Sequence, residues 1–365
     1  MNRKVDILLP PGGLYPALGT MLHAVFSDLG WQATVRNNAN AMLLDGDLLL
    51  LGGVTRQIEG LPELLRQRQG RKPATVLWQL EPLPPAELSP EGEKIGLRAA
   101  ALDWERMPRL LQKKLKWVAP LGTKLARLGR RWLALDYSRQ VVREPNHQGW
   151  VRYYVSHYVQ TVNEWRQIKL AHASGWIDHY FASTQPRVRF LRSRGINTEL
   201  IPVGYHPLWG QDRQLNRDID ALFLGYINRR PRGTNLRRLQ ESLADRGRTL
   251  TLAGNAFGPD RAHLLNRARI VLSLLRMPHD LAGMRMLMGM ACGALVVSEH
   301  CPDTDAYRPG EHFVMAGLDE LPAVIDYYLA HENERRKIAR QGYRFVTEEL
   351  TLANAVRKML AHTAI

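Results

Sequence analysis

Residues 270–299 read IVLSLLRMPHDLAGMRMLMGMACGALVVSE, and this stretch decides the fold class. It contains two apolar runs, at 270–275 and 294–298, which end in turn signals, as buried parallel strands do. The segment between them is typical of a helix. A strand, a helix and a second strand in succession predict a parallel sheet with a right-handed crossover.

The same alternation continues on both sides of this stretch. Apolar runs that predict further strands of the second half lie at 221–226, 249–253 and 313–316. Strands of the first half are predicted at 5–9, 31–35, 48–54, 74–80, 179–182 and 199–203, and helices at 18–29, 162–175 and 187–193. We therefore predict an α/β protein of two Rossmann-like domains. They face a cleft at the carboxyl ends of their strands, where ligands bind in this class.

Turn signals and composition set the predicted boundaries. The stretch 204–216 contains Pro207 and few periodic apolar residues, which favours a linker, and all nine tryptophans precede its end. Residues 318–360 are nearly all helix-forming. The predicted parts are an N-terminal domain at 1–205 with a basic helical insertion at 98–145, a C-terminal domain at 206–345, and a C-terminal helix at 346–365 that crosses back over the linker.

The composition is that of a folded protein without a membrane span. Of 365 residues, 45% are hydrophobic and 23% are charged, which excludes a disordered chain. No run reaches the roughly 18 apolar residues of a membrane helix, and the first apolar run is too short for a signal peptide. Two cysteines exclude a disulfide framework and a four-cysteine zinc site. We expect a cytoplasmic protein.

Positive charge is concentrated in a short part of the chain. The net charge is +15, and the segment 106–143 holds eleven Lys or Arg against one acid, Asp136. These cations are mixed with leucine and tryptophan, as in helices that lie on anionic lipid. The same segment suits nucleic acid, and a solvated basic helix is the third interpretation. The expected partner is an anionic membrane surface at its inner face, with nucleic acid as the alternative.

An ordered set of motifs accompanies the second half. In sequence they are Arg285-Met-Leu-Met-Gly-Met-Ala-Cys-Gly293, Ala294-Leu-Val-Val-Ser-Glu299, Pro309-Gly-Glu311, Asp319-Glu-Leu321, Tyr327-Tyr-Leu329 and Ala339-Arg-Gln-Gly342. Each is common by itself, but their order and spacing are specific. Together they resemble the C-terminal domain of GT-B glycosyltransferases, especially those grouped with spore maturation proteins. The detailed likeness covers residues 272–342, and a weaker one extends from 178 to the C-terminus.

The resemblance implies that the N-terminal domain faces the acceptor and that the C-terminal domain holds a nucleotide-activated sugar. A nucleoside diphosphate is bound by backbone N–H groups at helix N-termini and by guanidinium groups. Residues that the sequence offers for the donor are Gly225, Arg229, Arg230, Arg232, Arg285, Gly293, Glu299 and Glu311. A solvated surface is the alternative interpretation of these arginines.

One departure from the family pattern concerns the donor. Related retaining transferases carry two glutamates eight residues apart, one near the donor sugar and one at the ribose. The matching positions here are Asp280 and Met288. An aspartate accepts a hydrogen bond from a sugar hydroxyl, whereas a methionine cannot hold a ribose diol. Either another residue such as Glu299 or Glu311 contacts the ribose, or donor binding is weakened, or the domain has lost catalysis.

Three features of the first half are candidates for the acceptor side. Gly12 and Gly13 lie in a loop before the first helix, where glycines let a substrate approach the helix N-terminus, with a tight structural turn as the alternative. Glu81 follows a buried strand beside Trp78 and is a candidate base. His157 lies in an aromatic stretch and is a further catalytic candidate, although a lone histidine there is more often a core or rim residue.

These observations favour one function and leave two alternatives. The first is glycosyl transfer to a lipid-linked, polysaccharide or small-molecule acceptor, with the nucleotide sugar as co-substrate, no other cofactor and no metal. Asp303-Thr-Asp305 is too short a pattern to predict a metal site. The alternatives are a glycosyltransferase that modifies DNA bases and a catalytically inactive nucleotide-binding relative. Motifs of zinc and serine hydrolases are absent from the sequence.

Overall fold

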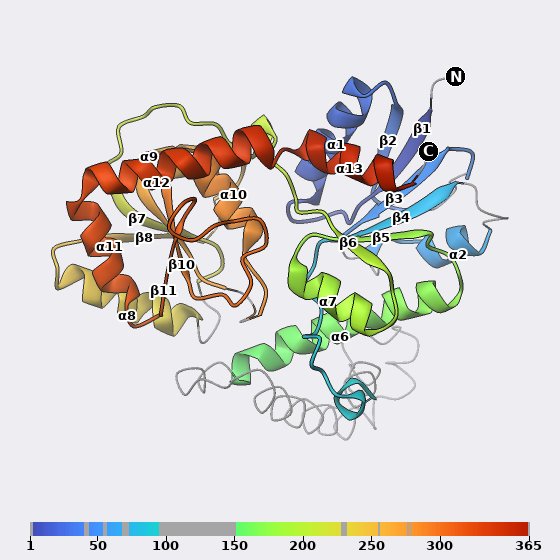
Figure 1. The fold of residues 1–365 in the computed structure, drawn as a ribbon, viewed down its shortest axis with the longest axis horizontal. Coiled ribbons are helices and arrows are strands. Elements are labelled where there is room, and N and C mark those ends of the chain that lie inside the picture. The colour runs from blue at the N-terminus through green and yellow to red at the C-terminus, as the bar shows by residue number, and fades with distance from the viewer. Residues whose placement is uncertain are drawn as a thin grey trace, which may run out of the picture.

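The structure is a computed structural model in which two α/β domains lie side by side (Figure 1). It describes residues 3–39, 44–53, 57–67, 73–94, 151–227, 232–254, 256–275, 277 and 279–363, with the backbone alone for 151–159. Each domain contains one sheet of parallel strands, so the predicted fold class is confirmed. The predicted basic insertion at 98–145 lies outside the described residues.

The N-terminal sheet has, among the described residues, six strands in the order β2-β1-β3-β4-β5-β6. The strands are β1 (Lys4–Leu8), β2 (Gln32–Arg36), β3 (Leu48–Gly52), β4 (Ala74–Gln79), β5 (His179–Ala182) and β6 (Thr198–Leu200). The helices are α1 (Tyr15–Asp28), α2 (Leu61–Arg66), α6 (Val151–Ala173) and α7 (Gln185–Ser193). Every residue of the central strand β3 is buried, which explains its unbroken apolar sequence.

The C-terminal sheet has, within the described ranges, the strand order β11-β10-β9-β7-β8. The strands are β7 (Ile219–Leu224), β8 (Leu250–Ala253), β9 (Ala268–Ser273), β10 (Leu295–Glu299) and β11 (Val314–Ala316). The helices are α8 (Arg232–Ala244), α9 (Gly258–Arg267), α10 (Gly283–Ala291), α11 (Leu321–Ala330) and α12 (Glu332–Arg344).

The chain then crosses back to the N-terminal domain, as predicted. A π-helical turn at Phe345–Glu349 follows α12, and α13 (Leu352–Thr363) packs beside α1 (Figure 1). Tyr205 N–H donates to Leu350 O over 2.6 Å, and Leu352 N–H donates to Tyr205 O over 2.8 Å. The last helix therefore begins at 352 and not at 346, because the preceding residues form the turn and pair with the linker.

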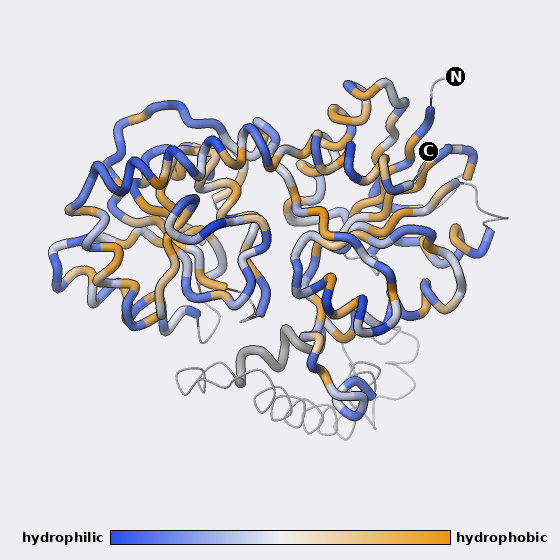
Figure 2. Tube along the Cα trace, viewed as in Figure 1, coloured by the Kyte–Doolittle hydropathy of each residue, from blue (hydrophilic) through white to orange (hydrophobic). Residues whose placement is uncertain are grey.

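Residues of high hydropathy lie along the central strands of both sheets (Figure 2). One continuous core cluster runs from the α1 side of the N-terminal sheet through α13 and Trp209 to α10. Separate clusters fill the other face of each sheet. Because the first cluster spans both domains, their contact includes buried apolar area, which stabilises association.

The predicted strands agree with the observed ones to within three residues at either end. Helix α2 was not predicted, because six residues are too few to display a helical period. Helix α6 begins at 151, earlier than the predicted 162. No helix among the described residues has the length and apolar character that crossing a bilayer requires.

Candidate active site at the domain interface

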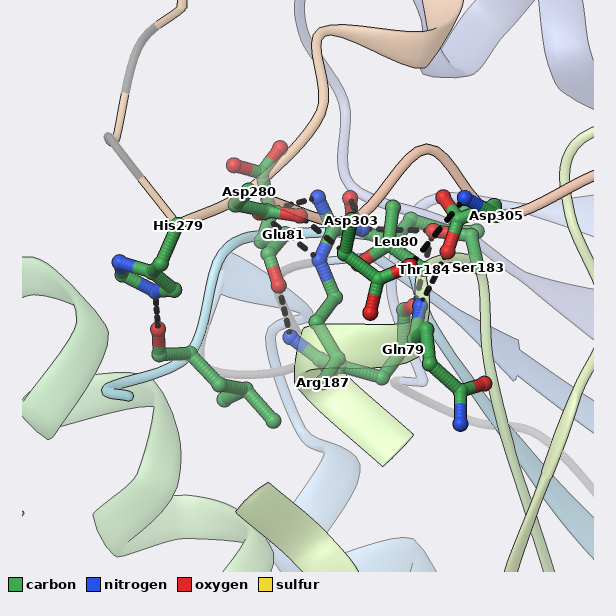
Figure 3. Close-up of polar contacts among 12 residues, drawn as sticks. Gln79, Leu80, Glu81, Ser183, Thr184, Arg187, His279, Asp280, Asp303 and Asp305 are labelled. Atoms are coloured by element: carbon green, nitrogen blue, oxygen red, sulfur yellow. Dashed lines mark hydrogen bonds and ion pairs between the residues drawn. The ribbon is translucent and has the colours of Figure 1, made fainter. Parts of the chain in front are cut away.

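Loops that follow strands of both sheets meet between the domains (Figure 3). The N-terminal domain contributes the segments after β4 and β5, which include the start of α7. The C-terminal domain contributes the segments after β9 and β10. In parallel sheets these are the carboxyl ends of the strands, where ligands bind in this fold class.

A buried ion pair joins the two domains at this place. Arg187 donates to Asp280 Oδ2 from Nη2 over 2.7 Å and from Nε over 3.1 Å, and Thr184 Oγ1 donates to Asp280 Oδ1 over 2.7 Å. Arg187 Nη1 also donates to Leu80 O and to Ser183 Oγ, both over 2.6 Å. Only 6% of Arg187 and 3% of Asp280 are exposed. Removing one partner would leave the other charge buried and uncompensated.

Two more carboxylates flank this pair and bind the same helix start. Asp305 Oδ1 accepts the backbone N–H of Gln185 over 2.5 Å, and Asp303 pairs with Arg189 (Figure 3 shows both aspartates). Burial raises the pKa of Asp305 to about 7, and the neighbouring aspartates act in the same direction, against the Gln185 N–H. Within the described residues, no group of three or more His, Cys, Asp or Glu is placed to hold a metal ion.

On the N-terminal side, Tyr15 donates a hydrogen bond to Glu81 Oε1 over 2.7 Å. Glu81 follows β4, whereas Tyr15 is the first residue of α1. Burial, and then the nearby carboxylate of Glu81, raise the pKa of Tyr15 above its ordinary value. The phenol therefore stays protonated and orients Glu81 as an acceptor.

On the C-terminal side, two arginines brace the carboxyl ends of β7 and β9. Arg285, near the start of α10, donates from Nε to the carbonyl oxygen of the last residue of β7 and from Nη1 to Leu274 O, both over 2.9 Å. Arg232, the first residue of α8, donates from Nη2 to Leu275 O over 2.8 Å. Both guanidinium groups lie over Phe223, at 4.7 Å and 5.8 Å from the ring centroid.

Glu299, the last residue of β10, lies beside these arginines. Its Oε1 accepts the Leu275 N–H over 3.0 Å, and its Oε2 has no hydrogen-bond partner in the described part of the chain. The residue is 5% exposed. Burial raises the pKa of Glu299 to about 8, opposed by the Leu275 N–H and by Arg232 and Arg285. Within the described residues, the hydrogen-bonding capacity of this buried oxygen is thus not used.

Comparisons with known proteins agree with this architecture. Residues 229–361 match the family described as glycosyl transferase-like. Sucrose-phosphate synthase from Thermosynechococcus elongatus overlays with a TM-score of 0.52 at 10% identity, over 100% of this chain and 98% of that chain. TarM of S. aureus overlays with a TM-score of 0.51 at 8% identity, over 87% and 55%.

HepE of Anabaena, solved with UDP and glucose, overlays with a TM-score of 0.48 at 13% identity, over 100% of both chains. A search of curated proteins finds no significant match. The overlay on sucrose-phosphate synthase covers both domains and both parallel sheets.

The fold is GT-B.

In this GT-B frame, several predicted donor residues lie together at the carboxyl edge of the C-terminal sheet. Gly225 follows β7 with φ 140°, and a Cβ there would lie 3.1 Å from Arg285 Nη2. Arg232, Arg285 and Glu299 form the cluster described above. Met288 is packed into the apolar core and is 7% exposed. Arg229 and Arg230 lie outside the described residues.

Two predicted donor residues do not lie in this part of the GT-B domain. Gly293 lies between α10 and β10, at the amino edge of the sheet. It has φ 73°, and a Cβ there would lie 2.5 Å from Asp212 Oδ2. Glu311 lies three residues before β11, also at the amino edge, and pairs with Arg308 over 3.0 Å. Ligands of this class bind at the opposite edge, so the geometry does not favour a donor contact for these two residues, and that contact stays a prediction.

The remaining predicted residues belong mainly to the N-terminal GT-B domain. Gly12 and Gly13 are exposed in the loop before α1, and Gly13 has φ 68°, a conformation that suits glycine. His157 lies on α6, where only the backbone is described. Glu81 contacts Tyr15, and Asp280 is held by Arg187. Their catalytic roles stay predictions.

Sequence reasoning missed Tyr15, Thr184 and Arg187. Thr184 and Arg187 lie at the start of the helix after β5, as residues of many α/β sites do, and this position was the one available signal. Their partner Asp280 lies 93 residues from Arg187 in the sequence, so no local pattern predicts the contact.

Proposed function

We propose that this protein is a glycosyltransferase that moves a sugar from a nucleotide-sugar donor to a hydroxyl of a lipid-linked, polysaccharide or small-molecule acceptor. The observation that carries the proposal is the arrangement of its two GT-B sheet edges. Arg232 and Arg285 lie at helix starts, at the carboxyl edge of the C-terminal sheet. Glu81 lies at the carboxyl edge of the N-terminal sheet. The family match of residues 229–361 supports the same activity, and the narrower likeness to spore-maturation-type transferases is part of the proposal.

The donor diphosphate is placed, in this proposal, at the starts of α8 and α10. Helix N-termini carry partial positive charge and backbone N–H donors, which favour phosphate. Arg232 and Arg285 add two full positive charges. When the bond between sugar C1 and the phosphate oxygen breaks, its electron pair leaves with the diphosphate. Positive charge fixed beforehand lowers the energy of that transition state without a metal.

Glu81 is the proposed base for the acceptor. As the acceptor oxygen bonds to sugar C1, its proton passes to the Glu81 carboxylate. The Tyr15 hydroxyl, 2.7 Å from Glu81 Oε1, holds this carboxylate in one orientation. A fixed base is effective because proton transfer requires a short, aligned contact.

Glu299 is the carboxylate that we propose for the ribose contact that Met288 cannot make. Its Oε2 lacks a partner among the described residues, whereas Glu311 is paired with Arg308 at the other edge of the sheet. A carboxyl oxygen accepts a hydrogen bond from a ribose hydroxyl. This contact would explain how the domain keeps a donor site without the second family glutamate.

The test is a thermal-shift panel of UDP, GDP and ADP with their glucose conjugates, with inorganic pyrophosphate as the control. A ligand that binds only the folded state, present at a concentration of about one hundred times its Kd, stabilises that state by about 2.7 kcal/mol. We expect one nucleoside series to raise the Tm and pyrophosphate alone to raise it less. No shift with any nucleotide would reject the donor site. Binding without slow release of sugar from the conjugate would favour a catalytically inactive relative.

A further inference from the structure

We propose that Arg187 of the N-terminal domain is a positioning residue that fixes the Asp280 carboxylate of the C-terminal domain when the two domains are closed. Asp280 matches the family glutamate that the resemblance places near the donor sugar. Under this proposal, the donor-side carboxylate acquires its orientation from the opposite domain. The inference rests on the proposed function and deepens it.

The N-terminal domain by itself orients the Arg187 guanidinium. Nη1 donates to Leu80 O after β4 and to Ser183 Oγ after β5, both over 2.6 Å. Leu80, Ser183 and Arg187 all belong to one domain, so these contacts do not depend on domain closure. They leave the edge formed by Nε and Nη2 directed at the other domain. A planar fork held in this way matches a carboxylate with little further loss of entropy.

Asp280 is bound at both of its oxygens. Oδ2 accepts from Arg187 Nη2 and Nε, and Oδ1 accepts from Thr184 Oγ1 over 2.7 Å (Figure 3). Every one of these donors comes from the N-terminal domain. With 2% of its side chain exposed, the carboxylate receives little competition from water. Separating the domains would remove these three hydrogen bonds at once, so closure and carboxylate orientation are coupled.

Neighbouring contacts align the same surfaces. The N–H of Gln185 at the start of α7 donates to Asp305, and Arg189, one turn on, pairs with Asp303. The helix start thus presents donors and positive charge to aspartates of the C-terminal domain. The Arg189 side chain is 47% exposed, whereas that of Arg187 is 7% exposed. Because solvent screens exposed pairs, Arg187 dominates the contact and Arg189 serves as its matched control.

The experiment compares full-length wild type with Arg187→Ala, Arg187→Lys and Arg189→Ala. Small-angle scattering measures the radius of gyration, calorimetry measures the Kd of the best nucleoside diphosphate of the panel, and nucleotide release from its glucose conjugate measures the rate at saturating donor. For Arg187→Ala we expect a larger radius of gyration, an unchanged Kd and a rate reduced about tenfold or more, as misplacement of a reacting group predicts. Arg187→Lys should recover part of the rate, and Arg189→Ala should resemble wild type.

Two results would overturn the proposal. One is a wild-type radius of gyration and rate in Arg187→Ala. The other is a loss confined to donor affinity, which would make Arg187 a binding residue. If Arg187→Ala does not fold, Arg187→Lys and Thr184→Val, which removes one hydrogen bond to Asp280, carry the same comparison. Wild type that binds no nucleotide rejects the proposed function itself, a result distinct from normal binding with unaffected Arg187 variants.

Discussion

The hydroxyl of Tyr15 and the carboxylate of Glu81 are joined by a 2.7 Å hydrogen bond between two strand ends of the N-terminal sheet. The Tyr15 ring also covers Gly53, which follows β3, since a Cβ there would lie 2.3 Å from Tyr15 Cε1. One aromatic side chain therefore packs together three segments that follow β1, β3 and β4. This packing fixes Glu81 relative to the sheet.

Substitutions of this pair separate orientation from chemistry. Glu81→Gln removes the proposed base, and we expect the transfer rate to fall by about 10²–10⁴-fold. Tyr15→Phe keeps the ring over Gly53 and removes only the hydroxyl, so we expect a loss of about tenfold to a hundredfold, because a hydrogen bond to a charged carboxylate contributes about 1.5–3 kcal/mol. Steady-state kinetics at saturating donor provides the measurement. Full activity in Glu81→Gln would exclude it as the base.

Arg285→Ala should affect both folding and donor binding. Two carbonyl groups at the ends of β7 and β9 lose their donors, which we expect to lower the free energy of unfolding by about 1–3 kcal/mol. If the guanidinium also contacts the diphosphate, binding weakens by about 1.5–3 kcal/mol. Calorimetry on the folded variant measures the second effect. The control is Arg237→Ala on the exposed side of α8. If Arg285→Ala is less stable but binds the diphosphate with unchanged affinity, Arg285 has a structural role only.

Glu299 predicts a pH dependence of stability. Its pKa is raised to about 8 in the folded protein, so the folded state keeps a proton that the unfolded state, near 4.5, has lost. Stability therefore falls as pH rises from about 4.5 to about 8, with a slope of at most about 1.4 kcal/mol per pH unit from this one proton. In Glu299→Gln this contribution is absent. Asp305 titrates in both proteins, so the difference between their Tm curves isolates Glu299, and parallel curves would contradict the assignment.

Gly204 in the linker lies against the backbone of the segment that precedes α13. A Cβ at Gly204 would lie 2.2 Å from the backbone carbon of Thr351, so Gly204→Ala must displace the segment before α13. We expect a loss of about 1–3 kcal/mol, as for other overpacked sites. Gly12→Ala is the control, because nothing lies within 4 Å of a Cβ there. Thermal unfolding of the two variants makes the comparison, and equal Tm values would show that the contact relaxes without cost.

The basic segment 106–143 gives a prediction that rests on the sequence. Each cation near an anionic leaflet contributes about 1 kcal/mol, so about half of the eleven would hold the protein there reversibly. We expect flotation with phosphatidylserine vesicles at low salt, partial retention at high salt through apolar residues such as Trp117, and no flotation with neutral vesicles. A gel shift with duplex DNA runs in parallel. Tight DNA binding that falls steeply with salt, without flotation, would favour the DNA-modifying alternative.

The order of the strands, and the places of several donor-side candidates at strand ends and helix starts, followed from the sequence alone. Apolar runs such as 270–275 report burial locally, because each strand buries its own side chains whatever its neighbours are. Local pattern also placed Gly225 and Glu299 at strand ends and Arg232 and Arg285 at helix starts, whereas their contact with a donor stays a prediction.

Tertiary structure decided which of these residues lie together. Gly293 and Glu311 belong to the same motif series as Arg285 but lie at the amino edge of the sheet, because a motif fixes order along the chain and not the edge that a residue reaches. Tyr15 meets Glu81 across 66 residues and Arg187 meets Asp280 across 93. Such pairs form only when the order of the strands and the contact between the domains bring distant segments together. These segments then exclude water, and the hydrogen bonds between them become stronger.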